Sequence, residues 1–174
     1  MAFRMGGMVR LETVLESWRT IRQDTAQTVE DMPAGEMDFK PVPEVMSFGE
    51  IARHVLDASH ALTGILLAGV DNLATPEFRK MVKEYVRPLP EKLDAATLAA
   101  ELRSSLEERL AELARQPAEF FAGIITRFDG QRVTRLEMIQ FIKEHELTHR
   151  QQLFLYLRMK GIVPVTTRRR QAKK

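Results

Sequence analysis

The sequence TRLEMIQFIKEHELTHRQQLFLYLRMK, residues 134–160, predicts one long helix that carries two of the chain's four histidines. It opens with Thr134 and Glu137 at the spacing of a capping box, in which the two side chains satisfy free backbone N–H groups at a helix start. Gly161 and Pro164 follow its end, as is typical of a helix stop. An apolar stripe at helical spacing runs along it, through Met138, Ile142, Leu153 and Tyr156.

Three further stretches have the apolar spacing of helices of similar length. The first runs from Leu11 to Glu30 and stops at the breaker cluster 32–35. The second starts at a capping box, Ser47 to Glu50, and ends near Gly69. The third follows Asp94, a suitable N-cap, and ends before residue 117, which is proline.

The connections between these helices show no alternating strand pattern. Residues 71–90 form a long connection with a short helix at 78–85, and residues 120–128 are less regular and lead to the turn Asp129-Gly130. Amphipathic helices without strands predict an all-α fold, an antiparallel four-helix bundle. We expect a long crossover between its second and third helices.

Length and composition indicate a single domain without disulfides. A chain of 174 residues fits one domain, which we place at residues 9–164, after a flexible N-terminus (1–8) and before a disordered basic tail (165–174). Cysteine is absent, which excludes disulfides, a protein thiolate nucleophile and any cysteine-bound zinc. With no signal peptide or membrane-length apolar run, we expect a soluble, cytoplasmic protein that binds neither membrane nor nucleic acid.

His145 and His149 stand four residues apart, so their imidazoles lie on one face of the predicted helix. We interpret this face as the inner one, because the pair continues the apolar stripe. Two inward imidazoles need hydrogen-bond partners or a shared metal ion, which requires both rings to be neutral. Satisfied core histidines are the alternative to a metal site.

The same stretch contains H-E-x-x-H, the pattern of zinc proteases, in which the glutamate acts as general base. Such a protease usually takes its third ligand from downstream, but no His, Asp or Glu follows His149. It also needs an edge strand for its peptide substrate, and none is predicted. We therefore interpret Glu146 as a bystander turned off the stripe.

The third ligand is expected from the second helix. His54 lies beside that helix's apolar stripe and can face the bundle interior. His60 is six residues later and is rotated by about 120° around the helix axis, so the two cannot share one site. His54 is thus the predicted ligand, and His60 is expected on a flank or at the surface.

The segment SFGEIARH, residues 47–54, and the pattern His145-x-x-x-His149-Arg150-x-Gln152 together resemble the DinB/YfiT-like family of four-helix-bundle metalloenzymes. The resemblance covers most of the chain and implies that His54, His145 and His149 bind a metal, usually zinc or nickel. It also implies activities that include thiol S-transfer, thiol-dependent isomerisation and hydrolysis, and a homodimer. Thr148 and Gln151 depart from the family pattern, which leaves the reaction open.

These observations favour a metal-dependent enzyme that acts on a small molecule, either as a thiol S-transferase with a low-molecular-weight thiol cosubstrate or as a hydrolase. Three imidazoles leave an open coordination position, as in reactive metal sites. Asp57 could orient His54, and Tyr156 could place a hydroxyl near the site, so both are candidate catalytic residues. The alternative is a non-enzymatic, dimeric, stress-related bundle in which the histidine or metal cluster is only structural.

Overall fold

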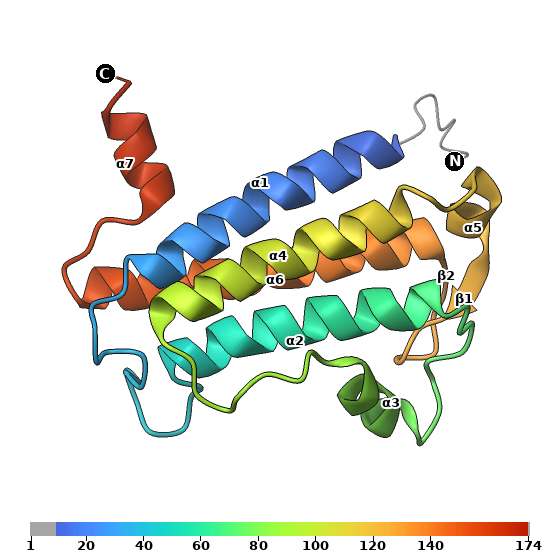
Figure 1. The fold of residues 1–174 in the computed structure, drawn as a ribbon, viewed down its shortest axis with the longest axis horizontal. Helices are drawn as coiled ribbons and strands as arrows, with labels where there is room; N and C mark the ends of the chain where they lie inside the picture. Colours follow the sequence, from blue (N-terminus) through green and yellow to red (C-terminus); the bar gives the residue numbers. More distant parts are fainter. Residues whose placement is uncertain (1–9, 174) are drawn as a thin grey trace, which may run out of the picture.

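The computed structural model describes residues 10–173 and arranges four long helices as a bundle (Figure 1). These are α1 (Leu11–Glu30), α2 (Phe48–Leu67), α4 (Ala95–Leu113) and α6 (Arg135–Met159). The predicted four-helix bundle is confirmed. Both predicted capping boxes form, with Ser47 and Glu50 at the start of α2 and Thr134 and Glu137 at the start of α6.

The long crossover sets an unusual order of helix directions. α1 packs against α4 and α6, and α2 packs against the same two helices, so α1 and α2 occupy opposite corners of the bundle. The crossover contains α3 (Phe78–Tyr85), the predicted short helix, and carries the chain back along the bundle. As a result α2 and α4 run in one direction, while α1 and α6 run in the other (Figure 1). The α2–α6 pair, which carries the predicted ligands, is antiparallel.

The stretch between α4 and α6 contains the strands that we did not predict. After α5 (Ala118–Ala122), strands β1 (Ile124–Thr126) and β2 (Arg132–Thr134) pair antiparallel in register Ile124↔Thr134. The predicted turn at Gly130, which has φ of 81°, joins them. Each strand has three residues, too short for an alternating pattern to stand out in the sequence.

The basic tail was predicted to be disordered, and this is corrected for most of its length. Residues Val165–Gln171 form the short helix α7. Its Arg169 donates to Asp24 of α1 (2.8 Å), and its Arg168 donates to Asp31 (2.7 Å). These two ion pairs hold the helix against the bundle. The predicted flexible segment, residues 1–8, lies outside the described residues.

The apolar core falls into two clusters along the bundle axis. One cluster includes Trp18, Leu66 and Met138, and the other includes Phe48 and Leu153. Between them lies a buried polar layer, described below with the site. Among residues 10–173, no helix is long and apolar enough to cross a membrane.

Candidate metal site

His54 of α2 and His145 and His149 of α6 converge on one point, as the sequence predicted. The Nε2 atom of His145 lies 3.2 Å from Nε2 of His54 and 3.1 Å from Nε2 of His149. The three nitrogens lie within 4.8 Å of one another. The ring planes are nearly perpendicular, with interplanar angles of 74°, 82° and 80°, and the short Nε2 separations show that a nitrogen of each ring points inward. We call these three residues the histidine cluster.

Gln152 fixes the tautomer of one histidine. Its Oε1 atom lies 2.7 Å from Nδ1 of His149. An amide oxygen only accepts hydrogen bonds, so Nδ1 of His149 must carry the proton and donate it. The lone pair of His149 is then on Nε2, the atom that faces the cluster. Gln152 enters the sequence analysis only as part of the family pattern, although its position three residues after His149 could have indicated this role.

The surroundings of the cluster favour neutral imidazoles. Burial, followed by the neighbouring His149 and His54, lowers the pKa of His145 to about 4. Burial and His149 also lower the pKa of His54. Both rings are therefore uncharged near neutral pH, which is the protonation state that a metal ion requires.

The cluster lies beside the core rather than inside it, which corrects the predicted helix face. All three histidines are half-buried, at the contact between α2 and α6. The fully inward positions of α6 belong to their neighbours: Glu146 is 1% exposed and Arg150 is 9% exposed. Because the three side chains are only half-buried, small molecules can reach this site, whereas a site enclosed in the core would be closed to them.

Glu146 is a central residue of the bundle, so its interpretation as a bystander was wrong. Its Oε2 atom accepts from Trp18 Nε1 at 2.7 Å, and its two oxygens accept from Arg22 at 2.7 and 2.8 Å. Arg22 also donates to Ser59 of α2 and to the carbonyl of Leu102 of α4, both at 2.7 Å. This polar layer therefore joins all four long helices directly behind the cluster.

His60 is buried, not on a flank or at the surface as expected. Arg109 of α4 donates to its Nε2 atom (2.8 Å), so Nδ1 carries the proton and donates to Ser105 (2.9 Å). Burial, followed by Arg109 and Arg87, lowers the pKa of His60 to about 4. His60 is thus a satisfied neutral histidine outside the cluster, and its partners come from α4, which no local pattern in α2 could reveal.

The two candidate catalytic residues are engaged in other contacts. Tyr156 donates its hydroxyl to the carbonyl of Met46 at 3.0 Å, which ties α6 to the loop before α2. Both carboxylate oxygens of Asp57 lie 2.9 Å from Nε of Arg53 and share its single N–H. A catalytic role for either residue stays a prediction.

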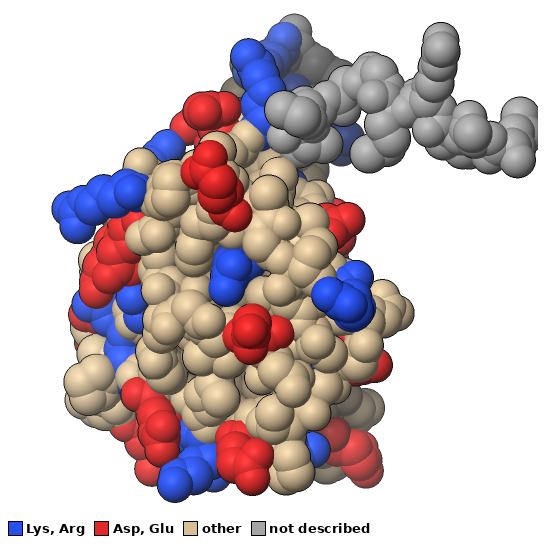
Figure 2. Space-filling model, turned by 90° about the vertical axis from the view of Figure 1, so that its right-hand side faces the viewer, with Lys and Arg blue, Asp and Glu red and all other residues tan. Residues whose placement is uncertain are grey.

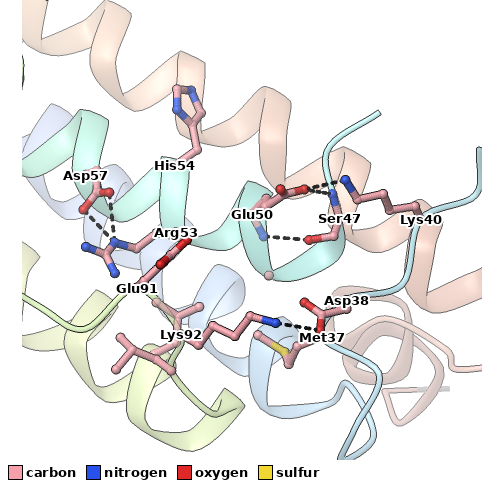
Figure 3. A pocket seen from close by; sticks show the side chains of 13 residues that line it. Met37, Asp38, Lys40, Ser47, Glu50, Arg53, His54, Asp57, Glu91 and Lys92 are labelled. Carbon is pink, nitrogen blue, oxygen red and sulfur yellow. Dashed lines mark hydrogen bonds and ion pairs between the residues drawn. The ribbon is translucent and has the colours of Figure 1, made fainter. Parts of the chain in front are cut away.

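A cavity of about 680 Å³ borders the cluster through His54 (Figure 3). The loop before α2, the outer face of α2 and residues 91–93 line it, whereas His145 and His149 do not. The lining contains three ion pairs, Lys40–Glu50, Arg53–Asp57 and Lys92–Asp38. In Figure 3 the His54 ring stands at the edge of this cavity and points toward α6, away from these pairs. The charged cavity and the converging nitrogens therefore lie on different sides of His54.

Comparisons with known proteins agree with this fold. A sequence model of the DinB superfamily matches residues 17–153. YjoA of Bacillus subtilis is 23% identical over 154 residues, which cover 88% of this chain and 93% of the relative. Its crystal structure, a DinB-like protein, superposes with a TM-score of 0.67 at 22% identity and covers 86% of this chain and 92% of that one.

Two structures with named chemistry share the fold at lower identity. YfiT of Bacillus subtilis, described as a "probable metal-dependent hydrolase with an unusual four-helix bundle topology", matches with a TM-score of 0.67 at 13% identity, over 92% of this chain and 94% of its own. A mycothiol-dependent maleylpyruvate isomerase matches with a TM-score of 0.62 at 14% identity, over 83% of this chain and 61% of its own. At these identities the likeness extends to the fold alone.

Proposed function

The chain belongs to the DinB superfamily, and from its histidine cluster we propose that it is a metal-dependent enzyme acting on a small molecule. The observation that carries the proposal is the convergence of three Nε2 atoms from two helices. Under this proposal His54, His145 and His149 hold a divalent metal ion, zinc or nickel.

Two of the three nitrogen separations in the cluster match those around such an ion. Two imidazole nitrogens bound to zinc at about 2.05 Å with a tetrahedral angle stand roughly 3.3 Å apart. The nitrogen separations around His145 are 3.2 and 3.1 Å, close to that value. Without an ion, Nε2 of His145 can form a full hydrogen bond with only one of its two close neighbours, since it carries either one proton or one lone pair. The donor set, three neutral nitrogens and no carboxylate, suits zinc or nickel better than calcium or magnesium.

Three protein ligands leave room for a substrate atom. A metal held there would supply Lewis acidity, either toward water for hydrolysis or toward a thiolate for transfer to an electrophile. The chain's own residues orient this site: Gln152 holds the His149 ring, and the polar layer around Glu146 fixes the helix that carries two of the ligands.

We favour thiol S-transfer or hydrolysis as the reaction class, with a low-molecular-weight thiol as cosubstrate in the first case. The support is the fold shared with YfiT, described as a probable metal-dependent hydrolase, and with an isomerase described as mycothiol-dependent, that is, dependent on a thiol. Since the chain has no cysteine, any reacting thiol must come from a substrate.

Metal analysis of protein expressed without a histidine tag tests the proposal. We expect about one zinc or nickel ion per chain, because three converging imidazoles make a complete protein ligand set for a reactive site. The variant His54→Ala should lose most of the ion while its helical circular dichroism stays unchanged. Gln151→Ala, an exposed change on the same helix as two of the ligands, is the matched control and should keep the ion.

Activity is then measured on metal-loaded protein, with small thiols plus electrophiles in one panel and simple esters and amides in another. Turnover that disappears in His54→Ala and persists in Gln151→Ala supports the enzyme. Absence of bound metal, or full retention of metal by His54→Ala, would contradict the proposal. Unfolding of the protein upon chelation, without turnover in either panel, would favour the purely structural cluster.

A further inference from the structure

Three phenylalanines form a continuous row that starts at the histidine cluster. Phe141 precedes His145 by one turn of α6, and the two rings are nearly parallel (19°) with centroids 6.5 Å apart. Phe128, in the loop between β1 and β2, contacts Phe141 edge-on at 5.6 Å. Phe128 also stacks on Phe78 of α3 at 5.4 Å. We call Phe78, Phe128 and Phe141 the aromatic row.

The aromatic row is open to solvent where it could contact a ligand. Phe128 is 40% exposed, and Phe78 and Phe141 are half-buried. Phe121, at the same end of the bundle, is by contrast only 6% exposed and belongs to the core. Uncharged residues cover most of this end face, which carries α5 and the hairpin (Figure 2). An exposed aromatic surface next to a reactive site offers apolar burial to whatever binds there.

The charged group that lies against Phe141 is ion-paired. The guanidinium of Arg127 lies over the Phe141 ring, 4.9 Å from its centroid, and forms an ion pair with Asp129. The pair balances the charge of Arg127, and its guanidinium covers part of the Phe141 ring. The cavity on the other side of His54 differs, because its lining is rich in Lys, Arg, Asp and Glu. The two sides of the cluster therefore favour chemically different groups.

We propose that the aromatic row binds an apolar, flat group of the substrate while the reacting atom lies at the histidine cluster. The substrate class is thus a small molecule with an aromatic or similar apolar substituent next to its reacting atom. This inference rests on the proposed function, since it assumes that the cluster holds a metal ion. Phe128 is the main specificity-determining residue, because it is the most exposed member of the row.

Two hydroxamates that bind metal ions through the same group make suitable probes. Acetohydroxamate carries a methyl group and benzohydroxamate a phenyl ring, so only the second offers the row a flat apolar group. Titration calorimetry on zinc-loaded protein should find benzohydroxamate at least about tenfold tighter, the ratio given by burying roughly 60 Å² of apolar surface. Phe128→Ala should reduce this preference to about twofold without changing the affinity for acetohydroxamate.

Two variants make the test specific to the aromatic row. Phe128→Leu keeps apolar area without an aromatic face and should give an intermediate ratio. Met159→Ala removes a side chain that is 52% exposed near the far end of α6, and should leave the ratio unchanged. Thermal unfolding of each variant is measured in parallel, because Phe128 is 40% exposed but also packs on Phe78 and Phe141, so Phe128→Ala should cost some stability.

The outcomes separate this inference from the proposed function. If zinc does not load, the proposed function fails and this inference fails with it. If both hydroxamates bind zinc-loaded protein equally well, the histidine cluster still binds metal as proposed. The proposal that the aromatic row binds the substrate is then wrong. A preference that persists in Phe128→Ala, or a loss of stability that weakens both probes alike, would also overturn the assignment.

Discussion

Glu146 accepts hydrogen bonds on both carboxylate oxygens, so its buried charge is fully paired. Both donors, Trp18 and Arg22, belong to α1, and Arg22 has the same low exposure as Glu146, 1%. Removing one partner from such a pair leaves the other charge buried without compensation, which is far less favourable than losing a surface ion pair.

We predict that Glu146→Ala lowers the free energy of unfolding by about 3–5 kcal/mol. Arg22 would keep its bonds to Ser59 and to the Leu102 carbonyl but would lose its counterion. Urea denaturation measures the change. Glu144→Ala, on the exposed face of the same helix, should stay within about 0.5 kcal/mol of the parent, and equal effects of the two changes would refute the role of the layer.

The sequence identified the ligand candidates but assigned the α6 faces wrongly, for a definite reason. His145 and Glu146 are adjacent, so their side chains differ by about 100° around the axis. The apolar stripe on α6 is broad, so a side chain that points in the direction of His145 or in that of Glu146 would continue it. Burial of a carboxylate is unfavourable unless it is paired, and its partners lie on α1, more than 120 residues earlier. No local pattern records such a partner.

At the scale of elements, helix bounds followed from local signals whereas helix contacts did not. The predicted first helix and the short helix at 78–85 match α1 and α3, because proline and glycine breakers lie next to them in the sequence. The packing of α3 and α4 on α2 depends instead on Gly64. A Cβ atom at Gly64 would lie 2.7 Å from Nη2 of Arg109 and 3.0 Å from Cδ1 of Tyr85.

We predict that Gly64→Ala destabilises the protein by about 1–2 kcal/mol, although alanine favours helices more than glycine does. Arg109 cannot move away freely, because His60 and Glu112 hold its guanidinium. Thermal or urea unfolding of the single variants and of Gly64→Ala combined with Arg109→Ala forms a double-mutant cycle. When residue 109 is already alanine, Gly64→Ala should cause little further loss of unfolding free energy. If the effects of the two substitutions simply add, Arg109 is not the group that the new Cβ atom meets.

At the scale of the whole molecule, the bundle keeps His60, outside the histidine cluster, neutral through contacts between α2 and α4. His60 faces Arg109, Arg87 and Arg22, with Glu112 as the opposing acidic group. Burial makes the largest contribution to lowering the pKa of His60 to about 4, from the ordinary value of 6.5 that we take for the unfolded chain. Between these values the unfolded chain binds a proton that the folded protein does not, so stability falls as the pH falls.

We therefore predict that the free energy of unfolding drops by about 1–2 kcal/mol more in the parent protein than in His60→Gln when the pH is lowered from about 7 to about 5. Glutamine does not titrate and can both accept from Arg109 and donate to Ser105. Urea denaturation of both proteins at the two pH values measures the difference. His54 and His145 are common to both proteins, so parallel pH dependences would mean that His60 has no part in the effect.

The bundle class and the grouping of the three histidines could be predicted, since helical spacing and a family resemblance both pointed to them. The hairpin, α7 and the aromatic row could not. Phe141 and Phe128 are separated by a turn and a strand, and nothing in the spacing of Phe78 connects it to either. The homodimer and the cytoplasmic location stay predictions.

The polar layer between the two apolar clusters also determines how the helices align along the bundle axis. A slip of α6 by one turn would shift Glu146 by about 5.4 Å, out of reach of Arg22 and into apolar surroundings. Apolar side chains tolerate such a slip far better than a buried ion pair does. The layer therefore fixes one alignment of α1 and α6 along the bundle axis. This alignment in turn sets the position at which the imidazoles of α2 and α6 meet.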